Sequence, residues 1–260
     1  MRVLRDYHLH TLHLRCANET MTISAIIESA RRRGLESIAV TDHLNERRFL
    51  GEHEKIRADL QTADRGNLEI FVGIELDVIP GRELPCDEGV MEKNGFQFAI
   101  GGPHGAYIER FSPSELVKVQ HRLHLEAISN PLIDVLVHPW WFERNDFEAA
   151  AFPWFKDMSF LPPAVARELA AAAKQHNTAI EISSSAIFSN AKYPELFKRQ
   201  YIDYLGLLAA EGAVFSTASD AHDISRMDTL SDLDDVVTRL GLRDSQLYHP
   251  SRGKRALRGK

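Results

Sequence analysis

Short apolar runs alternate with helical patterns along almost the whole chain, and this alternation restricts the fold more than any other feature of the sequence. The first such unit has an apolar run at 3–10, an amphipathic pattern at 22–33 and a second run at 36–41. Gly34 follows the helical pattern at the position where many helices end. A strand, a helix and a second strand in this order predict a βαβ unit with parallel strands.

Five further runs have the length and composition of strands that are buried on both faces of a sheet. They lie at 69–75, 96–101, 133–138, 178–183 and 213–219, and the helical patterns between them at 114–129, 162–175, 194–210 and 225–240. Seven strands with intervening helices predict an α/β barrel. We expect loops at 80–94, which contains Pro and Gly, and at 143–161, which is irregular and aromatic.

The chain has no internal repeat and no low-complexity linker, so we expect one barrel domain over residues 1–245. The remaining residues, 246–260, end in the basic sequence SRGKRALRGK, and we expect them to form a mobile tail.

Composition restricts the class of protein further. A chain of 260 residues can bury a full core without disulfides, and its two cysteines, Cys16 and Cys86, fit a reducing compartment. The net charge of −6 argues against a stable nucleic-acid partner. The chain shows neither a signal-peptide pattern nor an apolar run that could span a membrane, so we expect a cytoplasmic protein without a membrane partner.

Histidine and acidic residues stand where the predicted strands end. They are His8, His10, His43, Glu75, His104, His138, Asp220 and His222. In a (β/α) barrel the carboxyl ends of all strands meet at one rim, so these side chains would converge there. A single histidine in such a place often only satisfies backbone groups, but the repetition at one strand end after another favours a metal site. Imidazoles and carboxylates suit zinc, manganese or iron and leave positions open for water and substrate.

Four ordered motifs carry a resemblance to a known family. They are D-x-H-x-H-T at Asp6 to Thr11, T-D-H at Thr41 to His43, G-x-E at Gly73 to Glu75, and S-D-A-H at Ser219 to His222. Together they resemble the PHP (polymerase and histidinol phosphatase) family of metal-dependent phosphoesterases. The resemblance extends from residue 6 to residue 222.

The resemblance implies a distorted (β/α)7, TIM-like barrel with up to three divalent metal ions, zinc, manganese or iron, at the carboxyl rim of the strands. Carried over residue by residue, one ion would be held by His8, His10, Glu75 and Asp220, a second by Glu75, His104 and His138, and a third by His43 and His222. The family usually supplies a further histidine to the third ion, six residues after the second histidine of the opening motif. This chain has Cys16 there, with His13 three residues nearer. Either side chain could complete the third site, or that site could be weak or missing.

The function implied is hydrolysis of a phosphomonoester of a small molecule by attack of a metal-bound hydroxide, with Glu75, Asp220 and His222 as catalytic residues. Metal ions suit this chemistry because they neutralise phosphate oxygens and make bound water acidic. Three alternatives stay open: a phosphodiesterase or exonuclease acting on short oligonucleotides, a non-catalytic metal-binding regulatory module on the same barrel, and a related amidohydrolase. No lysine ends a predicted strand, which disfavours the amidohydrolase.

Several residues near the motifs invite supporting roles. Asp42 directly precedes His43 and faces the other way along a strand, Asp6 begins the motif that contains His8, and Glu181 lies inside an apolar strand, so we expect these three to orient ligands. Trp140 and Trp141 could form an apolar wall, whereas His121 and His124 read as ordinary helix residues. At least one arginine should face the phosphate, and the candidates are Arg15, Arg82, Arg110, Arg144 and Arg226.

Overall fold

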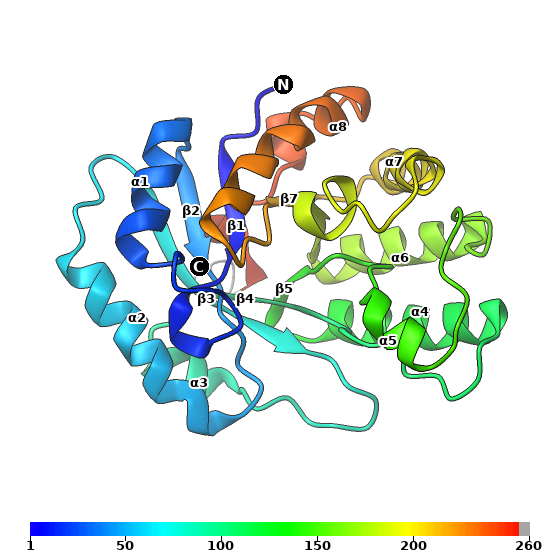
Figure 1. Cartoon of the computed structure of the whole chain (residues 1–260), viewed down its shortest axis with the longest axis horizontal. Coiled ribbons are helices and arrows are strands. Elements are labelled where there is room, and N and C mark those ends of the chain that lie inside the picture. The colour runs from blue at the N-terminus through cyan, green and yellow to red at the C-terminus, as the bar shows by residue number, and fades with distance from the viewer. Residues whose placement is uncertain (255–260) are drawn as a thin grey trace.

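The computed structural model describes residues 1–254, and its centre is a sheet of seven parallel strands in sequence order. The strands are β1 Arg5–Leu9, β2 Ser37–Val40, β3 Glu69–Asp77, β4 Phe98–Gly102, β5 Ile133–Leu136, β6 Ala179–Ser183 and β7 Phe215–Ala218. Each of the seven predicted apolar runs coincides with one of them, although β3 and β4 extend past the predicted ends to Asp77 and Gly102. The predicted α/β barrel is therefore confirmed (Figure 1).

The ends of the sheet approach each other and nearly close the barrel. The amide of Asp220 donates a hydrogen bond to the His8 carbonyl at 3.0 Å, and the amide of His10 donates one to the Ala221 carbonyl at 3.2 Å. These contacts join the end of β1 to the residues that follow β7. The first and last motifs of the chain are thereby brought side by side.

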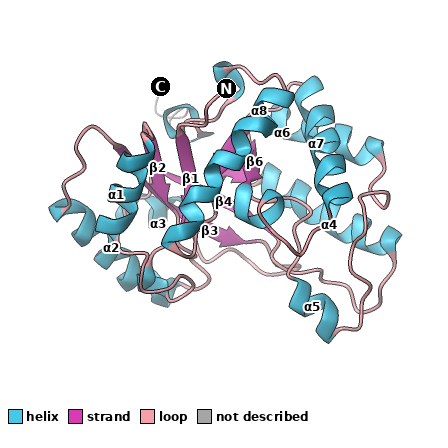
Figure 2. Ribbon diagram, turned by 45° about the horizontal axis from the view of Figure 1, so that its top comes forward, coloured by secondary structure: helices cyan, strands magenta, loops and turns pink. Residues whose placement is uncertain are grey.

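Helices surround the strands, as Figure 2 shows. They are α1 Ile23–Arg33, α2 Leu50–Thr62, α3 Glu88–Lys93, α4 Pro113–Ser129, α5 Arg144–Ala149, α6 Pro163–His176, α7 Glu195–Ala210 and α8 Leu233–Arg239. The helix α1 shows why these sequences fold locally: the Thr22 hydroxyl accepts a hydrogen bond from the Ala25 amide at its start, and Gly34 adopts a φ of 69° at its end.

The helices that differ from the sequence analysis have weak local signals. The prediction did not include α2, which begins at Leu50 without a side-chain cap. The segments expected to be loops contain two short helices, α3 and α5, each of six residues. The helix predicted at 225–240 is divided into a 3-10 helix, Ile224–Asp232, and α8. Short helices lack the several turns over which periodicity becomes visible.

Apolar side chains fill two layers. One lies between the strands and the surrounding helices, and the other fills the barrel interior near the amino ends of the strands. In the interior, Phe71 and Phe98 pack edge-on against Tyr7 with ring centroids 6.0 and 6.5 Å apart. Along β3, side chains two residues apart share a face, so Phe71, Gly73 and Glu75 all face the interior. Of these three residues, Glu75 lies nearest the carboxyl rim.

A register shift in β1 positions its two histidines. Asp6 pairs with Ile38 and Leu9 pairs with Val40, so β1 takes three steps where β2 takes two. This extra residue is the signature of a β-bulge, which re-aims a side chain. Tyr7 can therefore pack inside the barrel while its neighbour His8 faces the rim together with His10.

Part of the tail expected to be mobile is packed against the barrel in the structure. The amide of Tyr248 donates a hydrogen bond to the Phe215 carbonyl at 2.7 Å. The Lys254 ammonium is buried and donates to the carbonyls of Ile128 and Asn130 at 3.0 and 2.8 Å. Residues 255–260 of the predicted tail lie outside the described residues. Over residues 1–254, no helix combines the length and apolar character needed to cross a bilayer.

Candidate metal centre

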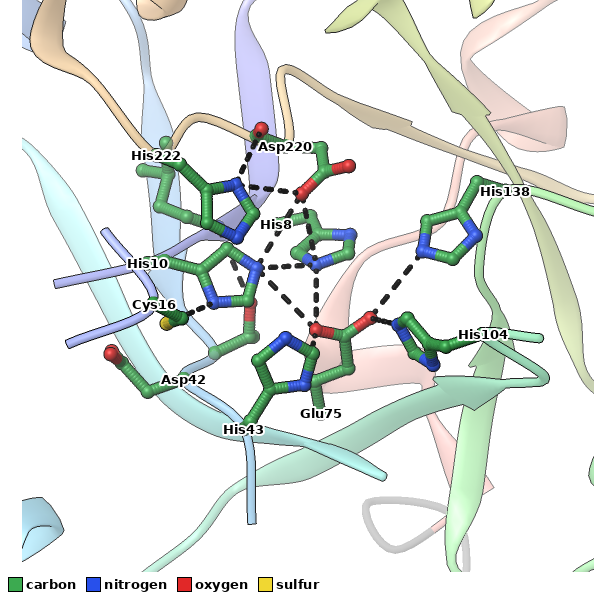
Figure 3. Close-up of polar contacts among 12 residues, drawn as sticks. His8, His10, Cys16, Asp42, His43, Glu75, His104, His138, Asp220 and His222 are labelled. Atoms are coloured by element: carbon green, nitrogen blue, oxygen red, sulfur yellow. Dashed lines mark hydrogen bonds and ion pairs between the residues drawn. The ribbon is translucent and has the colours of Figure 1, made fainter. Parts of the chain in front are cut away.

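The carboxylate of Glu75 lies at the middle of the cluster, buried at 1% exposure, with imidazoles on both sides (Figure 3). Its Oε2 atom is 3.0 Å from Nδ1 of His43, 3.2 Å from Nε2 of His8 and 3.4 Å from Nε2 of His10. Its Oε1 atom is 2.9 Å from Nε2 of His104 and 3.5 Å from Nε2 of His138. Each oxygen therefore has its own set of nitrogen neighbours, contributed by different strands.

Asp220 forms the other acidic side of the cluster. Its Oδ1 atom is 3.6 Å from Nε2 of His8 and 3.5 Å from Nε2 of His10. His222, two residues later, places Nδ1 3.5 Å from the same oxygen, and its ring stacks on His10 with centroids 4.0 Å apart. Asp220 has a φ of 54°, a conformation that costs energy outside glycine and is often found at functional sites.

The structure separates the two side chains that could complete a third site. The Sγ atom of Cys16 lies 3.6 Å from Nδ1 of His10, on the side of that ring away from Glu75 (Figure 3). His13 points elsewhere, with Nε2 2.8 Å from Oδ2 of Asp59. Of the two side chains, only Cys16 therefore lies among the other candidate ligands.

Among the residues that the structure describes, three overlapping groups of donor atoms are compact enough to hold a metal ion. They are His8 with His10 and Asp220, His43 with Glu75 and His104, and Cys16 with His10, His43 and His222. The Oε2 atom of Glu75 is buried and accepts no hydrogen bond from residues 1–254, although three imidazole nitrogens lie within 3.4 Å. A buried carboxylate oxygen without a hydrogen bond and a set of imidazoles and carboxylates both fit divalent cations.

The cluster is strongly coupled electrostatically. Burial opposes ionisation of Glu75, but the charges of His43, His8 and His104 outweigh it and hold the pKa of this carboxyl well below its usual range. Burial lowers the pKa of His43 to about 4. Burial acts in the same direction on His104, but Glu75 and Asp77 prevail and raise its pKa to about 10. In the absence of metal ions, His104 is therefore protonated and His43 neutral near pH 7, although both contact the same carboxylate.

Glu181 connects two candidate ligands from different strands. Its Oε1 atom lies 2.8 Å from Nδ1 of His8, and its Oε2 atom accepts a hydrogen bond from the His138 amide at 2.9 Å. A carboxylate on Nδ1 fixes the imidazole tautomer and leaves Nε2 for a metal. The buried carboxylate of β6 therefore positions the Nε2 atom that faces Glu75 and Asp220.

Asp6 and Asp42 contact backbone next to the site. Oδ1 of Asp6 accepts a hydrogen bond from the Ser219 amide at 2.8 Å, and Oδ1 of Asp42 accepts from the amide and hydroxyl of Thr11 at 2.9 and 3.0 Å. Burial raises the pKa of Asp6 to about 6 and that of Asp42 to about 7. Both residues hold the turns that follow ligand-bearing strands.

A pocket of about 670 Å³ opens from this cluster toward the loops after β5, β6 and β7. Arg226 lines it, whereas the other candidates, Arg15, Arg82, Arg110 and Arg144, do not. Trp141 also lines it, while Trp140 is buried and packs edge-on against His124, with centroids 4.8 Å apart. Of the two predicted wall residues, only Trp141 therefore contacts the pocket.

Sequence reasoning did not single out Glu143 and Lys192, which line the same pocket. The Nζ atom of Lys192 is 2.6 Å from Oε1 of Glu143, so the ion pair joins the loops after β5 and β6. The two residues stand in irregular segments, where no periodicity or motif marks them. Only the order of the strands along the sheet brings their loops together.

The chain is similar to known proteins along most of its length. A family model described as the PHP domain matches residues 6–217. A probable phosphatase of Thermoanaerobacter sp. (strain X514) is 22% identical over 262 residues, covering 98% of this chain and 93% of that protein. A probable phosphatase of Caldanaerobacter subterraneus subsp. tengcongensis is 29% identical over 240 residues, covering 88% of this chain and 81% of that protein.

The fold also occurs among solved structures. A crystal structure from Listeria monocytogenes, titled “putative histidinol phosphatase”, aligns with a TM-score of 0.57 at 14% identity. The alignment covers 86% of this chain and 97% of that one. At this identity the likeness concerns the barrel and not the substrate.

Proposed function

The chain belongs to the PHP domain family, and from this premise we propose that it removes the phosphate group from a small phosphomonoester. It is a hydrolase of the metal-dependent phosphoesterase class, as its relatives named probable phosphatases indicate. The observation that carries the proposal is the Glu75 carboxylate, with imidazole nitrogens 3.0–3.4 Å from one oxygen and 2.9–3.5 Å from the other.

We assign the metal ligands from this geometry and from the family. One ion would be held by His8, His10, Glu75 and Asp220, a second by Glu75, His104 and His138, and a third by Cys16, His43 and His222. When bound, two or three divalent ions neutralise the oxygens of a phosphate ester and lower the pKa of water toward about 7. Zinc, manganese and iron all suit this donor set.

The remaining roles fall to side chains that face the pocket. The Arg226 guanidinium forms no hydrogen bond or ion pair with any residue in the described part of the chain, so its fork is available for two phosphate oxygens. Without the third ion, His222, whose side chain is 40% exposed and lines the pocket, would donate a proton to the leaving oxygen; with that ion bound, the ring would serve as its ligand instead. Its contact with Asp220 orients the ring for this transfer.

The test begins with protein stripped of metal and reloaded with zinc, manganese or iron. Elemental analysis should find at least two ions per chain, and phenyl phosphate should be hydrolysed faster than bis(4-nitrophenyl) phosphate, a diester. Fewer than one ion per chain would refute the metal assignment. A preference for the diester would favour the oligonucleotide alternative.

A further inference from the structure

The pocket is much larger than a phosphate group requires. The pocket measures about 670 Å³, whereas a single water molecule in the liquid occupies about 30 Å³. The pocket therefore has room for many more atoms than the five of a phosphate group. The candidate ligands line one part of it, and the loops after β5, β6 and β7 line the rest. This outer wall must therefore contact the leaving group of the substrate.

The acidic groups of the outer wall are already engaged. Oε1 of Glu143 lies 2.6 Å from the Lys192 ammonium. Oδ1 of Asp223 accepts hydrogen bonds from the amide and hydroxyl of Ser225 at 2.8 and 2.6 Å, and its Oδ2 accepts one from Asn18. An ammonium or a second phosphate on the leaving group would have to break the Glu143–Lys192 ion pair or displace the partners of Asp223, and Arg226, the other cation of the wall, is already assigned to the phosphate that is removed. The wall therefore favours an uncharged leaving group.

The large apolar side chain of this wall is Trp141. Its ring packs against His138 with centroids 4.9 Å apart and against His104 at 6.3 Å. These are the two imidazoles nearest Oε1 of Glu75. Trp141 is only partly buried and lines the pocket, so a leaving group joined to a phosphate at the Glu75 cluster would meet its indole within a few bonds.

We infer that Trp141 determines specificity, and that the phosphate ester accepted by this site carries an uncharged planar ring that packs on its indole. This inference rests on the proposed function. A flat ring packed on the indole buries apolar surface and also gains the favourable geometry of an aromatic pair, whereas a flexible chain only buries apolar surface.

The test compares three phosphonates, which bind without being hydrolysed, at a pH above the second pKa of each, so that all three carry two negative charges on the phosphorus group. Isothermal titration of metal-loaded protein should show phenylphosphonate binding about 3- to 10-fold more tightly than propylphosphonate, with 2-aminoethylphosphonate no tighter than propylphosphonate. Trp141→Ala should remove the preference for phenyl over propyl, and Trp141→Phe should restore most of it. Leu196→Ala truncates an exposed leucine on α7 outside the pocket and serves as the control.

Several results would overturn the inference. Equal binding of the three phosphonates, tightest binding of the amine, or an unchanged preference in Trp141→Ala would each do so. Loss of metal in Trp141→Ala, measured by elemental analysis, would show that the indole only supports the two histidines. A phenyl preference without hydrolysis of phenyl phosphate would refute the proposed function and leave the ring site standing.

Discussion

The two ends of the barrel interior are built from the same strands but contain opposite chemistry. Near the amino ends, Tyr7, Phe71, Phe98 and Tyr248 form an apolar cluster, and the Tyr7 hydroxyl has a partner in Ser37 at 2.7 Å. Near the carboxyl rim, buried imidazoles and carboxylates surround Glu75, one of whose oxygens has no hydrogen bond.

This difference separates stability from function along a single strand. On β3, Phe71 packs among rings, and Glu75, four residues later, lies among histidines. Gly73 stands between them because a Cβ there would lie 2.9 Å from the Phe98 ring. Apolar burial stabilises the fold, whereas buried charges without counterions oppose it. Positive φ angles at His138, Trp140 and Asp220 add strain on the rim side. The amino end therefore stabilises the barrel, and we expect the rim to need bound ions for its stability.

The largest effect should come from Glu75→Gln. The loss of its charge removes the group that faces both sets of imidazoles, so we expect activity to fall more than about 100-fold, beyond the 10–100-fold typical of groups that only support a ligand. Glu69→Gln changes an exposed glutamate at the other end of the same strand and should leave activity near the wild-type value. Turnover at limiting metal and elemental analysis measure both variants. Wild-type turnover in Glu75→Gln would refute the bridging role.

Phe98→Ala tests the amino end of the barrel. This ring is completely buried, so its removal should lower the free energy of unfolding by about 3–5 kcal/mol, measured by urea denaturation. The folded fraction should still bind metal like the wild type, because the cavity forms below the rim. If Phe98→Ala lost metal but kept its stability, the amino end would support the metal site and would not be the part that stabilises the barrel.

The barrel and the convergence of its motifs were predictable from the sequence because both follow from local periodicity. Parallel strands buried on both faces give continuous apolar runs, and residues at their ends meet at one rim whatever the details of packing. The expected positions of His8, Glu75 and Asp220 at strand ends needed no knowledge of side-chain contacts.

The outer wall of the pocket was not predictable in the same way. Glu143 and Lys192 stand in loops, where chain direction depends on tertiary contacts instead of period, and the sequence did not distinguish Trp141, which lines the pocket, from the buried Trp140. The choice between His13 and Cys16 also needed geometry, because the contact of His13 with Asp59 crosses from the first loop to α2. The bulge in β1 is equally invisible in the sequence, although it determines how His8 and Tyr7 share one barrel.

Glu181→Gln tests whether the rim needs its supporting carboxylate. An amide offers one acceptor oxygen, so it cannot accept from both the His8 ring and the His138 amide. We expect a loss of metal affinity of about 10–100-fold, measured by competition with a chelator. Glu168→Gln makes the same change at an exposed glutamate on α6, which pairs with His121, and should have no effect. Equal affinity in the two variants would show that packing alone orients His8.

His124→Leu tests the layer behind the rim, where His124 packs against Trp140. Burial lowers the pKa of His124 to about 3, so between pH 6.5 and 3 the unfolded chain binds a proton that the folded chain does not. Stability should therefore fall as pH decreases, by about 1.4 kcal/mol per pH unit from this group. The leucine variant should lose this part of the slope in urea denaturation of metal-free protein between pH 6 and 4. An unchanged slope would contradict the assignment.

The smallest effect should come from Cys16, which contacts the cluster only at its edge, 3.6 Å from the His10 ring. If its sulfur completes a third site with His43 and His222, it will favour zinc over manganese, because soft thiolates select zinc. Cys16→Ser should then lower zinc-supported turnover more than manganese-supported turnover, and cobalt-loaded wild-type protein should show a sulfur-to-cobalt absorption band that the variant lacks. Cys86→Ser removes the buried cysteine outside the cluster, and His13→Ala removes a ring that faces Asp59; both should keep the band.

The reverse ranking of His13→Ala and Cys16→Ser would assign the donor to His13. If neither substitution changes metal content, absorption or turnover, the site works with two ions. The difference between the two ends of the barrel interior then lies in the ligands of these two ions, with the carboxylates of Glu75 and Asp220 at the rim and apolar side chains at the amino end.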